Sequence, residues 1–389
     1  MDKKKILTIG LAVLIYILAT GFSYFLFSRN VSSQNIASPV PVPTVGANGQ
    51  TQFSNSLPKT QACPLNGELY STQQEQWWQQ HRPLGVMVEN SVPARPQSGL
   101  SGADVVYEAV AEGGITRFLA VFYCQDAGEV GPVRSARTYF VDFISEYGNY
   151  PLYAHVGGAN TPGPADALGQ IDTYGWTNYN DLNQFSIGFP TYWRDYTRNG
   201  TTASTEHTMF STVDKLWAVG ASRGLTNVSK DGTPWTKGFV PYAFKSDAPA
   251  SARPTSQTIH IEFWPGSSDY YVDWTYNPQT NLYGRVNGGV VSKGRDTGKQ
   301  LMAKDVIVLY MRESHAIDGY MDNEHLLYGD KGTGNALVFM DGKEIKATWE
   351  KDSRTSRTIL SDQNGNQIKF DRGLMWFEIV PTYETVTVK

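Results

Sequence analysis

Residues 6–27 (ILTIGLAVLIYILATGFSYFLF) form a run of 22 positions without a charged side chain. A helix of about 20 apolar residues is long enough to cross the hydrocarbon core of a bilayer. The backbone within a bilayer must satisfy its own hydrogen bonds, so a helix is the expected structure. The run has no polar face, which distinguishes it from an amphipathic helix on a folded domain. The chain is therefore expected to attach to a membrane through residues 6–27.

The charges that flank this run predict its orientation. Lys3–Lys5 precede it, and Arg29 is the one cation that follows closely. Positive charge favours the cytoplasmic side, so residues 1–5 are expected to be a cytoplasmic tail and the rest of the chain to lie outside. The run is longer than the ~7–15 apolar residues of a signal peptide, and no small-residue cleavage motif follows it. We expect an uncleaved, single-pass anchor.

The net charge and the cysteines limit the kinds of site outside the membrane. The first 29 residues carry +3 of a total of −4, which leaves −7 for the remainder. Because a nucleic-acid surface needs a basic excess, no nucleic-acid partner is expected. Cys63 and Cys124 are the two cysteines, and an oxidising compartment permits a disulfide between them. Their spacing does not fit a zinc site, so neither a metal nor a cofactor is expected.

Composition divides the rest of the chain into segments. Residues 31–60 are rich in Ser, Pro, Gln and Asn without any periodicity, which predicts a flexible stalk over 28–80. Short β-rich runs then alternate with helical patterns, so residues 81–225 are expected to form a mixed α/β domain.

A second domain is expected after a proline-containing linker over residues 226–256. Residues 257–389 consist of short alternating or apolar runs separated by tight-turn pairs such as DG at 341–342. This pattern predicts a mostly antiparallel β domain, either a small barrel or a sandwich. The fold class is therefore α+β or α/β, with the mixed α/β domain first.

Arginines are concentrated in the first domain. Arg134 and Arg137 are three residues apart at the start of a helix predicted over 134–147, which places them on one face. A helix N-terminus favours an anion, so two guanidinium groups there need a nearby negative charge that neutralises them. With Arg95 or Arg117 they are expected to form a shallow anion-binding pocket. Alternatively, these arginines pair internally with Asp104, Glu108 or Glu112.

Glu108 and Glu112 are the candidates for catalytic carboxylates. A glycosidase needs one protonated and one ionised carboxyl group, about 5–10 Å apart. The two glutamates lie near the end of a predicted strand at 104–110, which permits this role without requiring it. The sequence has no nucleophile elbow, P-loop or HExxH zinc motif.

Long ordered motifs give the chain a family resemblance. RPLGVMVENSVPARPQSGL, ADVVYEAVAEGGITRFLAVF and GPVRSARTYF in the first domain, with GLMWFEIVP in the second, resemble the YerB-like putative lipoproteins. The resemblance covers about residues 82–382 and implies two domains, attachment to the cell surface and an unknown function. The positions that match the family pattern are Arg95, Gln97, Glu108, Glu112, Arg117, Arg134 and Arg137. This chain has an apolar span where lipoprotein members carry a lipid-modified cysteine.

Three functions are compatible with these features. The first is binding of an anionic envelope component, such as peptidoglycan, through Arg95, Gln97, Arg117, Arg134 and Arg137. The second is hydrolysis of cell-wall glycan with Glu108 or Glu112 as the acid. The third is a protein-docking scaffold whose arginines are paired internally. The absence of a nucleophile and base at a fixed spacing favours binding over catalysis.

Overall fold

The computed structural model describes the chain except residues 1, 31–39, 47–48, 199, 201 and 322–323. It divides into two compact units, residues 1–41 and 42–389. Much of the predicted stalk, at 31–39, lies outside the described residues.

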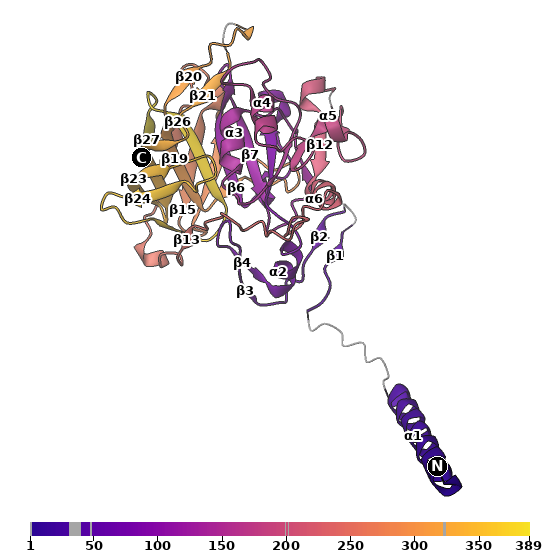
Figure 1. The fold of residues 1–389 in the computed structure, drawn as a ribbon. Helices are drawn as coiled ribbons and strands as arrows, with labels where there is room; N and C mark the ends of the chain where they lie inside the picture. The colour runs from indigo at the N-terminus through magenta and orange to yellow at the C-terminus, as the bar shows by residue number, and fades with distance from the viewer. Residues whose placement is uncertain (1, 31–39, 47–48, 199, 201, 322–323) are drawn as a thin grey trace. The chain divides into compact units, whose positions relative to one another are not determined.

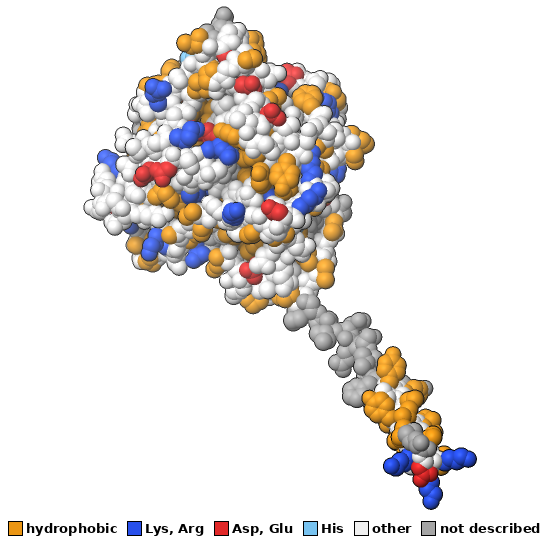
Figure 2. Space-filling model, in the orientation of Figure 1, with side chains coloured by type: hydrophobic (Ala, Val, Ile, Leu, Met, Phe, Trp, Pro, Cys, Tyr) orange, Lys and Arg blue, Asp and Glu red, His pale blue; other side chains and the backbone are white. Residues whose placement is uncertain are grey.

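The first unit contains helix α1 (Lys3–Asn30), so the helix expected over residues 6–27 is confirmed. Apolar side chains cover its surface and lysines gather at its N-terminal end (Figure 2). Lys3–Phe25 is long and apolar enough to cross a membrane, and none of it is buried in the structure. An N-terminal signal sequence would meet the same description.

The second unit is built on a ten-stranded sheet to which both halves of the chain contribute (Figure 1). The strand order is β10-β9-β5-β7-β6-β26-β19-β22-β23-β24. Strands from the first half are β5 (Leu84–Glu89), β6 (Val105–Glu112), β7 (Ile115–Phe122), β9 (Leu152–His155) and β10 (Asp181–Asn183). Strands from the second half are β19 (Asp305–Met311), β22 (Gly332–Met340), β23 (Lys343–Lys351), β24 (Ile359–Asp362) and β26 (Met375–Pro381). The halves join where β6 and β26 pair in parallel.

A six-stranded sheet from the second half covers one face of the large sheet. Its strands are β14 (Thr258–Ile261), β15 (Val272–Asn277), β16 (Leu282–Asn287), β17 (Val290–Val291), β18 (Met302–Ala303) and β27 (Val386–Val388). The Trp274 ring packs 5.2 Å from that of Trp376 on β26. The second half therefore forms two packed sheets, as expected for a sandwich.

Helix α3 (Thr138–Ile144) packs on the opposite face of the large sheet, where the ring of Phe143 stacks 5.0 Å from that of Tyr107 on β6. Gly220 of α6 (Val213–Ser222) lies against Leu152, which is on the same face as the six-stranded sheet. The remaining helices are α2 (Thr72–Trp78), α4 (Ala167–Thr173) and α5 (Gln184–Ile187). Because β5, β6 and β7 are covered on both faces, their sequences are apolar runs without alternation. The predicted mixed α/β first half and mostly antiparallel second half are both confirmed.

Short strands complete the fold. They are β1 (Thr44–Val45), β2 (Thr51–Gln52), β3 (Lys59–Ala62), β4 (Leu69–Ser71), β8 (Glu129–Val130), β11 (Trp193–Arg194), β12 (Met209–Thr212), β13 (Ala243–Phe244), β20 (Glu313–His315), β21 (Leu326–Tyr328) and β25 (Lys369–Phe370). β13 pairs with β25, and Trp235 and Tyr242 are buried, so the predicted linker over 226–256 is packed against the core.

The expectation of a stalk up to residue 80 is wrong for residues 59–80. These residues form β3, β4 and α2, and Trp78 is buried. The disulfide that the sequence permits between Cys63 and Cys124 is present, with an S–S distance of 2.08 Å. Burial of apolar side chains and the disulfide hold residues 59–80 against the first half of the chain. The polar composition of these residues did not indicate this packing.

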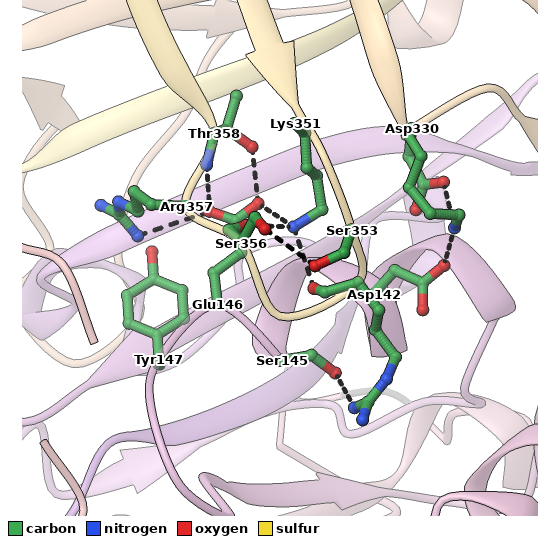
Figure 3. Close-up of polar contacts among 12 residues, drawn as sticks. Asp142, Ser145, Glu146, Tyr147, Asp330, Lys351, Ser353, Ser356, Arg357 and Thr358 are labelled. Atoms are coloured by element: carbon green, nitrogen blue, oxygen red, sulfur yellow. Dashed lines mark hydrogen bonds and ion pairs between the residues drawn. The ribbon is translucent and has the colours of Figure 1, made fainter. Parts of the chain in front are cut away.

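A buried ion pair also joins the two halves (Figure 3). Lys351 Nζ lies 2.7 Å from Glu146 Oε1, and both side chains are fully buried. Lys351 also donates to two backbone carbonyls of the loop before β24, and the Thr358 amide donates to Glu146. Removing either charge would leave the other buried and unpaired, which is strongly destabilising.

Candidate functional site

The backbone around Arg134 differs from the expectation of a helix over 134–147. Arg134 donates its amide to Met87 O and Val133 donates to Met209 O, which holds this segment extended. Helix α3 begins at Thr138, with Arg137 as its N-cap residue. The predicted helix therefore starts four residues late, because pairing with neighbouring strands replaces its first turn.

A β-bulge places Glu112 among the arginines. In a regular strand Glu112 would share a face with Glu108. The pairing of β6 with β7 shifts register between Val110 and Glu112, which reverses this alternation. Glu112 Oε1 consequently lies 2.8 Å from Arg117 Nη2, on the face opposite Glu108.

The structure brings Arg117, Arg134 and Arg137 together around two carboxylates. Arg137 contacts the second oxygen of Glu112, and Arg134 Nε lies 3.6 Å from Glu89 Oε1. Burial would raise the pKa of Glu112, but the neighbouring arginines outweigh it and lower that pKa to about 2. We call Glu89, Glu112 and these three arginines the Glu112 cluster. Each of its three arginines contacts a carboxylate of the protein itself.

Glu89 also binds two groups from other segments. His207 Nδ1 lies 2.9 Å from Glu89 Oε1, and Ser91 Oγ donates to the same oxygen at 2.7 Å. Ser91 Oγ also lies 3.3 Å from His207 Nδ1, the ring nitrogen that contacts Glu89. A serine–histidine–acid relay needs the serine and the acid on different ring nitrogens, so these residues are not arranged as one.

Arg95 and Gln97 lie in a different place, beside a cavity of about 260 Å³. Seven polar residues line this Arg95 cavity, together with Pro96 and the two valines of β17; the polar residues are Asn90, Arg95, Gln97, Arg285, Asn287, Ser292 and Lys293. Arg95 Nε donates to Asn90 O at 3.2 Å, and its guanidinium lies 5.1 Å from the Tyr270 ring centre. Gln97 Nε2 donates to Asn90 Oδ1 at 2.9 Å. The cavity thus lies between the two halves of the chain.

Positive charge dominates this cavity. The described residues that line it include Arg95, Arg285 and Lys293 and no acidic residue. Arg285 Nη2 lies 2.6 Å from Glu108 Oε2, behind the cavity wall. Burial and, second, the Arg285 charge lower the pKa of Arg95. The two guanidinium groups therefore repel each other.

Glu108 is fully buried and bound on both oxygens. Thr116 Oγ1 donates to its Oε1 at 2.7 Å, and Arg285 pairs with its Oε2. Glu378 lies opposite it in register and accepts from Trp274 Nε1 at 2.7 Å. Burial and the Glu108 charge raise the pKa of Glu378 well above its ordinary value. Glu378 is therefore held in the protonated form.

These contacts indicate whether Glu108 and Glu112 could act together as a pair of catalytic carboxylates. Glu108 and Glu112 lie on opposite faces of the sheet, so they do not face each other across one substrate bond. The low pKa of Glu112 keeps it ionised at neutral pH, which is unsuited to a general acid. The geometry therefore gives no support to a glycosidase pair made of these residues.

Three residues that line the Arg95 cavity were not expected from the sequence, namely Arg285, Asn287 and Lys293. They come from β16 and the hairpin after it, almost 200 positions beyond Asn90. A signal was available, because Arg285 and Asn287 alternate on one strand directly before the Gly288–Gly289 turn.

One group of possible metal ligands occurs among the residues that the structure describes. It consists of Cys63, Asp104 and Cys124. Because the two sulfurs form a disulfide, they are not available as thiolate ligands.

Comparison with known proteins identifies the class to which this fold and site belong. Residues 67–226 match the N-terminal domain, and residues 259–377 the C-terminal domain, of the family described as "Protein of unknown function (DUF3048)". The chain belongs to this two-domain family.

One relative is "Putative lipoprotein YerB" of Bacillus subtilis (strain 168). It is 29% identical over 343 residues, which are 87% of this chain and 92% of the relative. The crystal structure of the YerB protein from Bacillus subtilis matches with a TM-score of 0.68 at 25% identity, covering 84% of this chain and 100% of that one. The resemblance drawn from the sequence motifs is confirmed. A lipoprotein relative and the apolar helix α1 both fit attachment to a membrane.

Proposed function

We propose that this chain is a single-pass membrane protein of the cell envelope that binds an anionic envelope component in the Arg95 cavity. The N-terminus is cytoplasmic and residues after the anchor are outside, in accord with Lys3–Lys5 before the apolar run. Peptidoglycan, whose peptides end in carboxylates, is the candidate ligand.

The observation that carries this proposal is the charge of the cavity. Arg95, Arg285 and Lys293 line a space of about 260 Å³, and the described residues that line it include no carboxylate. Guanidinium groups bind carboxylates and phosphates through paired, charge-assisted hydrogen bonds. The volume is slightly below the ~300–1,000 Å³ of sites for whole small molecules, which suits one charged end of a larger ligand.

Two lysines of one hairpin allow a matched test. Lys293 lines the cavity, whereas Lys299 is exposed on the same hairpin outside it. Full-length protein in detergent is titrated with sonicated peptidoglycan by calorimetry. Because a charge-assisted contact contributes ~1.5–3 kcal/mol, Lys293→Ala should weaken binding roughly tenfold or more. Lys299→Ala should bind as the wild type does. Equal affinities of the two variants would contradict the proposed site.

A docking scaffold is the second candidate, and the Glu112 cluster favours it. Arg117, Arg134 and Arg137 contact carboxylates of the protein itself. Under this function Arg134→Ala should lower the melting temperature and leave peptidoglycan binding per folded molecule unchanged. Of the residues first expected to bind the ligand, the proposed site keeps Arg95 and Gln97. Because Arg134 is not part of it, the binding proposal also predicts that Arg134→Ala leaves peptidoglycan binding per folded molecule unchanged.

A further inference from the structure

A second cavity, of about 510 Å³, lies where the end of α2 meets α6. We define this Trp77 cavity by Trp77, Gln79, Gln80, His81, Trp217 and Asn227, which line it. None of these residues belongs to the Arg95 cavity or to the Glu112 cluster. The Trp77 cavity thus needs an explanation of its own.

Aromatic rings form one side of the Trp77 cavity. The Trp77 and Trp217 ring centres are 5.3 Å apart, and the His81 ring lies 4.7 Å from each. Trp217 Nε1 already donates to Arg82 O at 2.9 Å, so its indole N–H is occupied. Trp217 is buried (3% exposed), so the ring surface open to a ligand on this side belongs to Trp77 and His81, which are both partly exposed. Such surface favours contact with C–H groups.

The charge of this cavity differs from that of the Arg95 cavity. Burial lowers the pKa of His81 to about 4, so its ring is neutral at physiological pH. Asp214 is the one acidic residue, and no Lys or Arg occurs, among the described residues that line it. This environment lacks the concentrated charge that an anionic or cationic ligand requires.

Amide side chains form the exposed rim. Gln79, Gln80 and Asn227 are all exposed and line the cavity. Each amide supplies both hydrogen-bond donors and an acceptor, as a ligand with many hydroxyl groups requires. A pyranose ring combines an apolar C–H face with a hydroxyl edge, which matches rings beside amides.

From this combination we propose that the Trp77 cavity binds a neutral saccharide. The sugar ring packs against Trp77 and His81, and the amides of Gln79, Gln80 and Asn227 bind its hydroxyl groups. A volume of about 510 Å³ accommodates a short oligosaccharide segment. This inference does not depend on the function proposed for the Arg95 cavity.

The test uses full-length protein in a detergent without a sugar headgroup, because a maltoside would compete. The probes are three neutral tetrasaccharides: chitotetraose, cellotetraose and maltotetraose. Calorimetry should detect binding of at least one of them. Gln80→Ala and Asn227→Ala should each weaken it about fivefold or more, since each removes hydrogen bonds to the ligand. Trp77→Ala should abolish it.

Gln76→Ala is the matched control, because Gln76 is an exposed glutamine of α2 that does not line the cavity. It should bind the saccharide as the wild type does. The proposal is overturned if none of the three probes binds at millimolar concentration, or if Gln80→Ala and Asn227→Ala match Gln76→Ala. Lys293→Ala should leave saccharide binding unchanged, so failure of either site is distinguished from failure of the other.

Discussion

At the residue scale, two buried glutamates opposite each other carry different charges. Glu108 pairs with Arg285, whereas burial beside the Glu108 charge keeps Glu378 protonated. A protonated carboxyl and an amide have the same shape and similar hydrogen bonds. We therefore predict that Glu378→Gln changes the free energy of unfolding by less than about 1 kcal/mol at pH 7.

Glu108→Gln is the matched comparison for this pair. It leaves Arg285 buried without its carboxylate, and breaking such a pair costs about 3–5 kcal/mol. Denaturant unfolding of both variants at pH 7 measures the difference. Equal destabilisation by the two substitutions would show that Glu378 is ionised and would contradict the assignment.

Glu112 gives the protein a specific acid sensitivity. Its pKa is about 2 in the folded chain, below its ordinary value of 4.5, because of the surrounding arginines. The unfolded chain therefore binds a proton first as the pH falls. The stabilisation is complete above pH 4.5 and is lost progressively toward pH 2.

The variant Glu112→Gln tests this pH dependence. Its stability should fall below that of the wild type at pH 6 and approach it as the pH decreases toward 2. Glu350→Gln, at an exposed position of β23, is the control and should follow the wild-type curve. A constant difference between Glu112→Gln and wild type from pH 6 to 2 would exclude a titrating ion pair.

The sequence predicted part of the candidate site at this scale. Arg134 and Arg137 were grouped by helical spacing, but Arg134 precedes helix α3 and contacts Glu89. Glu112 was one of three internal partners expected as an alternative, and it contacts Arg117 and Arg137. The bulge at Val110 that turns Glu112 toward them has no clear sequence signal. The proximity of Arg285 to Arg95 could not be predicted, because the pattern of a strand does not indicate which distant loop packs against that strand.

At the element scale, the segment before the large sheet is held by a covalent bond. The Cys63–Cys124 disulfide closes a loop of 61 residues that includes β4, α2 and β5. Cross-linking a loop of this size stabilises a protein by roughly 2–4 kcal/mol. The double variant Cys63→Ala/Cys124→Ala should lose about that free energy of unfolding and retain the fold.

Thiol labelling checks the disulfide directly. The native, non-reduced protein should incorporate no alkylating reagent, and mass spectrometry should find one disulfide-linked peptide pair. Two alkylated thiols under these conditions would contradict the structure. The sequence permitted this bond but did not predict α2, because a polar helix that buries Trp78 resembles a linker by composition alone.

At the scale of the whole molecule, one sheet passes through both halves of the family's domain pair. The division into mixed α/β and antiparallel parts was predictable from local periodicity. The parallel pairing of β6 with β26 was not, since it joins residues about 270 positions apart and depends on tertiary contacts. The Arg95 cavity is a product of that long-range arrangement.

The orientation of the chain in the membrane is also testable at this scale. If residues after the anchor are outside, an epitope placed after Lys389 is accessible from the exterior. Protease added to intact cells stripped of their wall should remove the epitope, and a cytoplasmic marker protein should survive. Protection of the epitope while the cells remain intact would contradict the proposed topology.

Binding of an anionic envelope ligand in the Arg95 cavity is the proposed function of this protein. The most direct measurement compares peptidoglycan affinity and melting temperature for wild type and Arg95→Gln, using full-length protein in detergent. The account predicts that binding per folded molecule falls at least roughly tenfold, with a smaller fractional effect at high salt. A variant that melts markedly lower but binds peptidoglycan with wild-type affinity per folded molecule would show that Arg95 is structural and that the proposed function is wrong.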